Sequence, residues 1–228
     1  MHARQLILLL LIASIAFAAN SVTITIDGSG SMKDRIGNER KFEIARNATL
    51  CLIDSIKEGD EVAIFVFEDY HKVSLILPFT TNKEAMRSAV RSMTSEFGST
   101  DLRAGINVSA SYALANASNA NKVILVVSDG GAASSALNAT AKAFHERGIS
   151  KIQVIGLNVK NDTNAGKALD NIATNGGGIF YSTLDYATVC DAFKEAYNDA
   201  AVDEGGKCCP LLIILPLALA ICISISKS

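Results

Sequence analysis

The stretch VTITIDGSGS, residues 22–31, decides the fold of this chain. Its first half is rich in β-branched residues, which favour a strand, and the strand is expected to end at Asp27. Gly28 and Gly30 then break the regular pattern and predict a turn. Apolar residues at helical spacing follow over residues 41–56. The stretch therefore predicts a strand, a turn and a helix in direct succession.

The same alternation of strands and helices continues along the chain. Short, apolar or β-branched runs predict further strands at residues 61–67, 73–79, 122–127, 151–157 and 178–181. Helical patterns cover residues 84–93, 101–117, 134–147, 165–173 and 185–200. The short link after residue 67 predicts an antiparallel hairpin, whereas strands separated by helices need parallel crossovers. We expect an α/β fold with a doubly wound, Rossmann-like and mostly parallel six-stranded sheet, one antiparallel edge strand and helices on both faces.

The first 18 residues differ from the rest of the chain. A short polar start precedes an apolar run over residues 6–17, and Ala16-Phe17-Ala18 has the pattern of a signal-peptidase site. A run of roughly 12 apolar residues is too short to span a bilayer, which favours a cleaved signal peptide over residues 1–18. An uncleaved anchor is the alternative. In both cases Arg4 stays inside, so the domain that follows is expected outside the cytoplasm.

The C-terminal end is also apolar. No charged residue occurs from Cys208 to Ser226, and we expect residues 210–226 to form a transmembrane segment after a short linker at residues 204–209. The chain is thus expected to be a single-pass protein of the cell membrane with an extracytoplasmic domain. Small residues at 198–201, a polar spacer and an apolar tail also resemble a lipid-attachment signal, which leaves a lipid anchor at the cell surface as the alternative.

Residues 19–203 are enough for one well-buried domain and too few for two. The net charge is −2 and no basic stripe occurs, so nucleic acid is not expected as a partner. Two of the five cysteines, Cys51 and Cys190, belong to the domain. An oxidising compartment permits a bridge between them. However, one falls late in the first helix and the other early in the last, so we expect them at opposite ends and unpaired.

Polar residues gather where the expected parallel strands end. Asp27 ends the first strand, Ser29 and Ser31 follow it, Thr100 precedes a helix, and Asp129 follows the KVILVV strand. In open sheets of this type, ligands bind beyond the carboxyl ends of the strands. Two carboxylates and three hydroxyls are hard oxygen ligands, which suit Mg²⁺, Mn²⁺ or Ca²⁺ rather than zinc. The sequence therefore predicts a divalent metal site at this edge.

Three motifs in order carry a resemblance to a known family. They are the D-x-S-x-S run with its following methionine (residues 27–32), FGSTDL (residues 97–102) and VVSDG (residues 126–130). Together with residues 59–62 and 65–67, they resemble von Willebrand factor A domains that have a metal-ion-dependent adhesion site. The resemblance runs from about residue 22 to residue 200. One departure is Ser99, which stands where the family pattern has a second glycine.

The resemblance implies a role for each site residue. Ser29, Ser31 and Thr100 would coordinate the metal, while Asp27 and Asp129 would act directly or through water. It also implies an adhesion-type function, in which the metal binds an aspartate or glutamate carboxylate of a partner protein. A scaffold or assembly domain with a merely stabilising metal is the alternative.

An enzymatic function fits the sequence less well than a binding function, and we do not expect an enzyme. Ser29 or Ser31 lies at a strand-to-helix turn, as a hydrolase nucleophile does, yet no G-x-S-x-G elbow is present. A serine nucleophile needs a base, and His71 and His145 are expected on the surface. A dinucleotide loop is excluded because Lys33 stands where the third glycine is required.

Overall fold

Six strands form the main sheet of the computed structural model, which describes residues 19–69, 71–130 and 135–201. The strands are β1 (Asn20–Asp27), β4 (Glu61–Asp69), β5 (Lys72–Thr80), β6 (Asn121–Ser128), β7 (Lys151–Leu157) and β8 (Phe180–Thr183). The helices are α2 (Lys41–Ser55), α3 (Lys83–Ser92), α4 (Leu102–Asn116), α5 (Ser135–Glu146), α6 (Asn164–Asn175) and α7 (Tyr186–Ala201). A short 3-10 helix, η1 (Gly30–Lys33), and a two-stranded hairpin of β2 (Arg35–Ile36) and β3 (Glu39–Arg40) follow β1.

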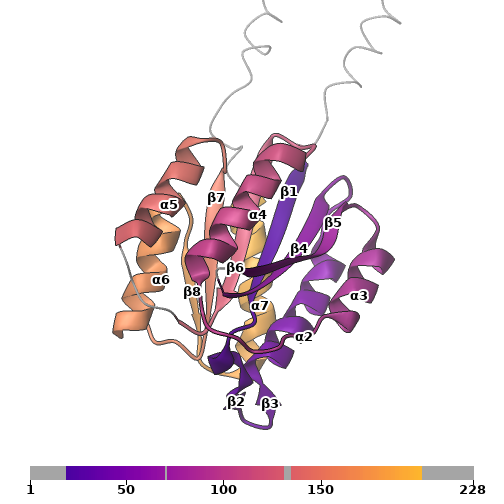
Figure 1. Cartoon of the computed structure of the whole chain (residues 1–228). Coiled ribbons are helices and arrows are strands. Elements are labelled where there is room, and N and C mark those ends of the chain that lie inside the picture. Colours follow the sequence, from indigo (N-terminus) through magenta and orange to yellow (C-terminus); the bar gives the residue numbers. More distant parts are fainter. Residues whose placement is uncertain (1–18, 70, 131–134, 202–228) are drawn as a thin grey trace, which may run out of the picture.

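The order of the strands confirms the predicted topology. It is β5-β4-β1-β6-β7-β8, with parallel pairing from β4 to β8 and an antiparallel pairing of β4 with the edge strand β5 (Figure 1). Five parallel strands, one antiparallel edge strand and helices on both faces make up the α/β fold that the sequence predicts. The last strand begins at Phe180, two residues later than expected. The β2–β3 hairpin was not predicted, because strands of two residues are too short to show a periodic pattern.

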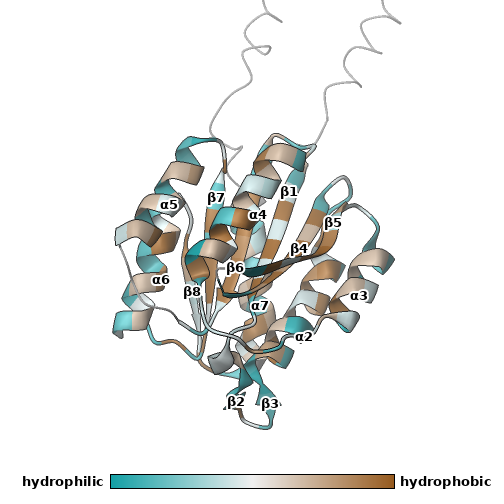
Figure 2. Cartoon of the chain, in the orientation of Figure 1, coloured by the Kyte–Doolittle hydropathy of each residue, from teal (hydrophilic) through white to brown (hydrophobic). Residues whose placement is uncertain are grey.

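Each face of the sheet is covered by its own hydrophobic core. On one face, alternate residues of β1 (Val22, Ile24 and Ile26) are fully buried against α2, α3 and α7. On the other face, Ile124 and Val126 of β6 pack with α4, α5 and α6. Figure 2 shows the contrast between the apolar strands and the polar hairpin β2–β3. Because both faces of the parallel strands are covered, ligands reach the sheet only at its edges and ends.

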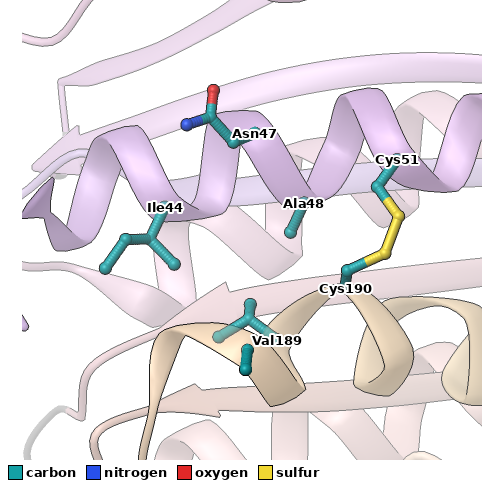
Figure 3. Close-up of a pocket in the computed structure, with 7 residues that line it drawn as sticks. Ile44, Asn47, Ala48, Cys51, Val189 and Cys190 are labelled. Carbon is teal, nitrogen blue, oxygen red and sulfur yellow. A yellow bond between two sulfur atoms is a disulfide. The ribbon is translucent and has the colours of Figure 1, made fainter.

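A disulfide joins Cys51 in α2 to Cys190 in α7, so the expectation of unpaired cysteines was wrong. The two helices pack against each other, and the Cα atoms of the two cysteines lie 6.0 Å apart (Figure 3). The error arose because a position along one helix does not fix how far that helix is shifted along its neighbour. α2 and α7 are offset so that the third turn of the first faces the second turn of the other.

The two ends of the domain lie close together at the amino edge of the sheet. The Asn121 side-chain amide donates to the Asn20 carboxamide oxygen and, at 3.3 Å, to the backbone oxygen of Ala200. Within the described ranges, no helix is both long and apolar enough to cross a bilayer. The expected signal peptide (residues 1–18), the linker (residues 204–209) and the transmembrane segment (residues 210–226) lie outside the described residues.

Candidate metal site

The end of β1 brings a carboxylate and a tight turn together. Asp27 is fully buried, and its Oδ1 accepts a hydrogen bond of 2.8 Å from the Ser29 backbone N–H. This bond closes the turn that η1 continues. Gly28 permits the turn, because a Cβ at this position would lie 2.6 Å from Ser95 Oγ and 2.9 Å from Val66 Cγ1. The glycine therefore lets the loop after β1 approach β4 and the loop after α3 closely.

Four of the five predicted ligands form one hydrogen-bonded cluster. The Ser29 and Ser31 hydroxyl oxygens lie 3.3 Å apart, and the Ser31 hydroxyl donates to Asp129 Oδ1 at 2.7 Å. Asp27 joins this chain through its bond to Ser29. The carboxyl ends of β1 and β6 meet here, as they must in a parallel pair, and Asp129 follows β6 directly.

Ser128 is a member of the site that the sequence analysis did not single out. Its hydroxyl lies 2.6 Å from Asp27 Oδ2 and 2.6 Å from the Gly130 backbone oxygen. Burial raises the pKa of Asp27 to about 6, although the hydrogen bonds from Ser128 and Ser29 act in the opposite direction. The nearby Asp129 carboxylate raises the pKa further. Ser128 was visible in the S-D-G motif, but nothing in the sequence indicated that it contacts Asp27.

Lys41 is the second residue that sequence reasoning missed. It is the first residue of α2, and its ammonium group lies 2.8 Å from Asp129 Oδ2. The two side chains are 11% and 5% exposed, so this is a buried ion pair. Asp34 Oδ2 lies 3.8 Å from the same ammonium but is 72% exposed. No motif places this lysine, because 88 residues separate it from Asp129.

The fifth predicted ligand, Thr100, lies in an exposed loop at the same edge. The Gly30 backbone N–H donates to the Gly98 backbone oxygen at 2.7 Å. The Asp101 backbone N–H donates to the Glu68 backbone oxygen at 3.3 Å. These bonds fix the backbone on both sides of Thr100 beside η1 and β4. Asp101 caps α4, because its side chain accepts a hydrogen bond of 2.9 Å from the Ala104 backbone N–H. The structure thus puts Thr100 near the cluster without a hydrogen bond to it.

Glu68, at the end of β4, holds the first part of this loop. It is buried, and its Oε1 accepts the Glu96 backbone N–H at 2.9 Å, while Lys72 lies 3.2 Å from its Oε2. The left-handed residue of the loop is Phe97, with a φ of 59°, and not Ser99. A serine in place of the family's second glycine is therefore compatible with this backbone.

The oxygen atoms that the cluster offers as ligands fit a small, hard cation. No group of three or more histidine, cysteine, aspartate or glutamate side chains gathers anywhere in the described part of the chain. A site of two carboxylates and neutral hydroxyls offers only oxygen ligands, which Mg²⁺ and Mn²⁺ accept together with retained waters. Of the two carboxylates, Asp129 pairs with the Lys41 ammonium, whereas Asp27 accepts hydrogen bonds from Ser29 and Ser128 and forms no ion pair with Lys41.

Comparisons with known proteins agree with the fold. Residues 22–132 match the family model of the von Willebrand factor type A domain. None of the curated proteins matches the sequence. Among solved structures, the conserved hypothetical protein BatB from Bacteroides thetaiotaomicron superposes with a TM-score of 0.66 at 20% identity, over 80% of this chain and 98% of that one.

Two proteins of bacterial pili are similar in the same way. The vWF domain of the type V pili tip protein Mfa5 from Porphyromonas gingivalis has a TM-score of 0.67 at 14% identity, over 85% of this chain and 99% of that one. The PilB minor pilin from Streptococcus sanguinis has a TM-score of 0.69 at 16% identity, over 83% of this chain and 63% of that one. At these identities the structures establish a shared fold. The fold and the family model together support the assignment of this chain to the von Willebrand factor type A domain family.

Proposed function

We propose that the domain binds a partner protein through a divalent metal ion held by Asp27, Ser29, Ser31, Thr100 and Asp129. The observation that carries the proposal is the cluster of two buried carboxylates and two serine hydroxyls, joined by bonds of 2.7 to 3.3 Å. Domains of this family generally mediate interactions between proteins. When bound, Mg²⁺ or Mn²⁺ supplies a coordination position that a carboxylate oxygen of the partner can occupy.

The chain's own residues give the site its order. Asp27 and Asp129 supply negative charge, and Ser128 and the Ser29 N–H orient the Asp27 carboxylate. Glu68 holds the loop that carries Thr100, which would keep the Thr100 hydroxyl available to the metal. An aspartate or glutamate of the partner is the natural occupant, because it adds a hard anionic oxygen. The surrounding loops then determine which partner fits.

Two other functions compete with this proposal. A scaffold domain with a stabilising metal is favoured by the Lys41–Asp129 pair, which already neutralises one of the carboxylates. A serine hydrolase is not favoured, because the Ser29 and Ser31 hydroxyls contact each other and the carboxylates of Asp27 and Asp129, and, among the residues that the structure describes, no histidine or lysine base.

Thr100→Ala is expected to weaken partner binding by about 2 kcal/mol, or some thirtyfold in affinity, without unfolding the domain. The reason is that Thr100 is an exposed loop residue, whose hydroxyl would bind the metal and lies outside the core. Proteins retained by the immobilised chain in Mg²⁺ provide the partner, whose affinity is then measured by calorimetry in Mg²⁺ and in EDTA.

Ser99→Ala is the matched control, since it removes a hydroxyl from the neighbouring exposed residue of the same loop. It is expected to leave the affinity within threefold of wild type. If Thr100→Ala and EDTA both leave partner binding unchanged in a folded protein, the metal has only a structural role and the scaffold function is correct.

We also propose that the domain is displayed outside the cytoplasm, attached to the membrane through its C-terminal segment. The Cys51–Cys190 disulfide supports this, because disulfides persist mainly in oxidising compartments. Protease added to intact cells is expected to degrade the domain while a cytoplasmic marker protein stays intact. Protection of the domain until the cells are lysed would contradict this location.

A further inference from the structure

Lys41 occupies a position that the proposed function does not explain. Its ammonium group contacts Asp129 Oδ2 at 2.8 Å, while the Ser31 hydroxyl occupies Oδ1 of the same carboxylate at 2.7 Å. Both oxygens of Asp129 therefore have a partner inside the protein. A carboxylate in this state has to give up at least one of these partners to bind a metal ion directly.

The ion pair is buried and built into the start of a helix. Lys41 begins α2, and its backbone N–H donates to the Asp34 backbone oxygen at 2.9 Å. This bond fixes the start of the helix beside the site. Removing one member of a buried pair leaves the other charge uncompensated, which is strongly unfavourable. The lysine thus satisfies Asp129 for as long as no other cation does.

The charges favour an exchange of one cation for another. Asp27 and Asp129 carry two negative charges, Lys41 carries one positive charge, and a divalent ion supplies two. Like charges in a poorly solvated site repel each other, so the ammonium and a metal ion beside Asp129 oppose each other's binding. Asp34 gives the ammonium a second place, since its Oδ2 lies 3.8 Å away and faces solvent.

We propose that Lys41 is a tethered competitor of the metal, which holds Asp129 in the metal-free domain and moves toward Asp34 when a divalent ion binds. The inference rests on the proposed metal-dependent function and adds a residue that sets the metal affinity. Partner binding would then begin only at metal concentrations high enough to displace Lys41.

The test is a calorimetric titration of the metal-stripped full chain with Mg²⁺. Lys41→Met removes the ammonium but keeps an unbranched apolar side chain, and is expected to tighten Mg²⁺ binding at least tenfold. The matched control is Lys33→Met, which removes the same charge from an exposed residue of η1 that lies over the Phe97 ring. It is expected to change the affinity less than threefold, so it separates the local contact from the overall charge.

Asp34→Asn provides a second test in a chain that keeps Lys41. It removes the site that receives the displaced ammonium, and is expected to weaken Mg²⁺ binding about threefold. The competition is refuted if Lys41→Met binds Mg²⁺ no more tightly than wild type, or does not fold even in saturating Mg²⁺. It is also refuted if Asp34→Asn binds Mg²⁺ as tightly as wild type or more tightly.

The outcomes also separate this inference from the proposed function. If the wild-type chain binds Mg²⁺ and Lys41→Met binds it no more tightly, only the role of Lys41 is refuted. Wild type and variant that both bind no Mg²⁺ at millimolar concentration refute the metal site and the competition together. Binding by Lys41→Met alone supports the competition and shows that Lys41 replaces the metal in the natural chain.

Discussion

Replacing Cys51 and Cys190 together by alanine is expected to lower the free energy of unfolding by about 4 kcal/mol. The bridge spans a sequence separation of 139 residues, and closing so long a loop removes much of the conformational freedom of the unfolded chain. The replacement also removes the covalent link between α2 and α7, which pack against each other in the native domain.

Urea denaturation of the oxidised wild type and of the double variant measures this effect. Replacement is a more specific test than reduction, because the chain has three further cysteines, Cys208, Cys209 and Cys222. Each single variant, Cys51→Ala or Cys190→Ala, is expected to lose as much stability as the double variant, since either one abolishes the bridge. A loss below 1 kcal/mol in the double variant would contradict this role of the disulfide.

Asp27→Asn is expected to abolish Mg²⁺ binding and, at the same time, to stabilise the metal-free domain by about 3 kcal/mol at neutral pH. The gain is expected because the buried carboxyl has a pKa of about 6 in the folded state and 3.8 as its ordinary value. Its ionisation therefore opposes folding above pH 6. An asparagine keeps the neighbouring hydrogen bonds, since its oxygen can accept from the Ser29 N–H and its amide can donate to Ser128.

The pH dependence of this difference has a definite sign. A carboxyl group whose pKa is raised by folding binds its proton more tightly in the native state, so wild-type stability in EDTA is expected to fall as the pH rises from about 4 to about 6. Below about pH 4 the carboxyl is protonated in both states, and the advantage of Asp27→Asn is expected to vanish.

Denaturant titrations in EDTA at pH 4 and pH 7.5, with calorimetry for Mg²⁺, test both parts. Asp170→Asn is the control, because it makes the same replacement at an exposed position of α6 far along the chain from the site. If Asp27→Asn is less stable than wild type at pH 7.5, the ionised Asp27 carboxylate does not destabilise the metal-free domain. If Asp27→Asn still binds Mg²⁺ as wild type does, Asp27 is not a metal ligand.

The sequence predicted the fold because its signals were local and repeated. Buried runs such as KVILVV and the helical spacing after Lys41 each specify one element, and helices between strands leave parallel crossovers as the solution. Asp27, Ser29, Ser31 and Asp129 were predicted together for the same reason, since parallel strands bring their carboxyl ends to one edge.

What was missed depends on contacts between distant segments. Lys41 pairs with Asp129 because α2 happens to begin beside the end of β6, and neither residue's neighbours indicate this. The Cys51–Cys190 bridge depends on the offset between two helices, which is set by side-chain packing along their whole length. Glu68 was expected in a turn, yet β4 continues through it and uses it to hold the loop of Thr100.

The disulfide also determines how the domain would carry a mechanical load. The site lies at the carboxyl edge of the sheet, and α7 ends at the opposite edge, where Ala200 contacts Asn121 (Figure 1). A pull on the C-terminal end of α7, resisted by a partner at the site, first tends to peel this helix from the sheet. Peeling has to stop at Cys190, because the bridge transfers the force to α2. Tension would then reach α2, the helix whose first residue contacts the Asp129 carboxylate of the candidate site.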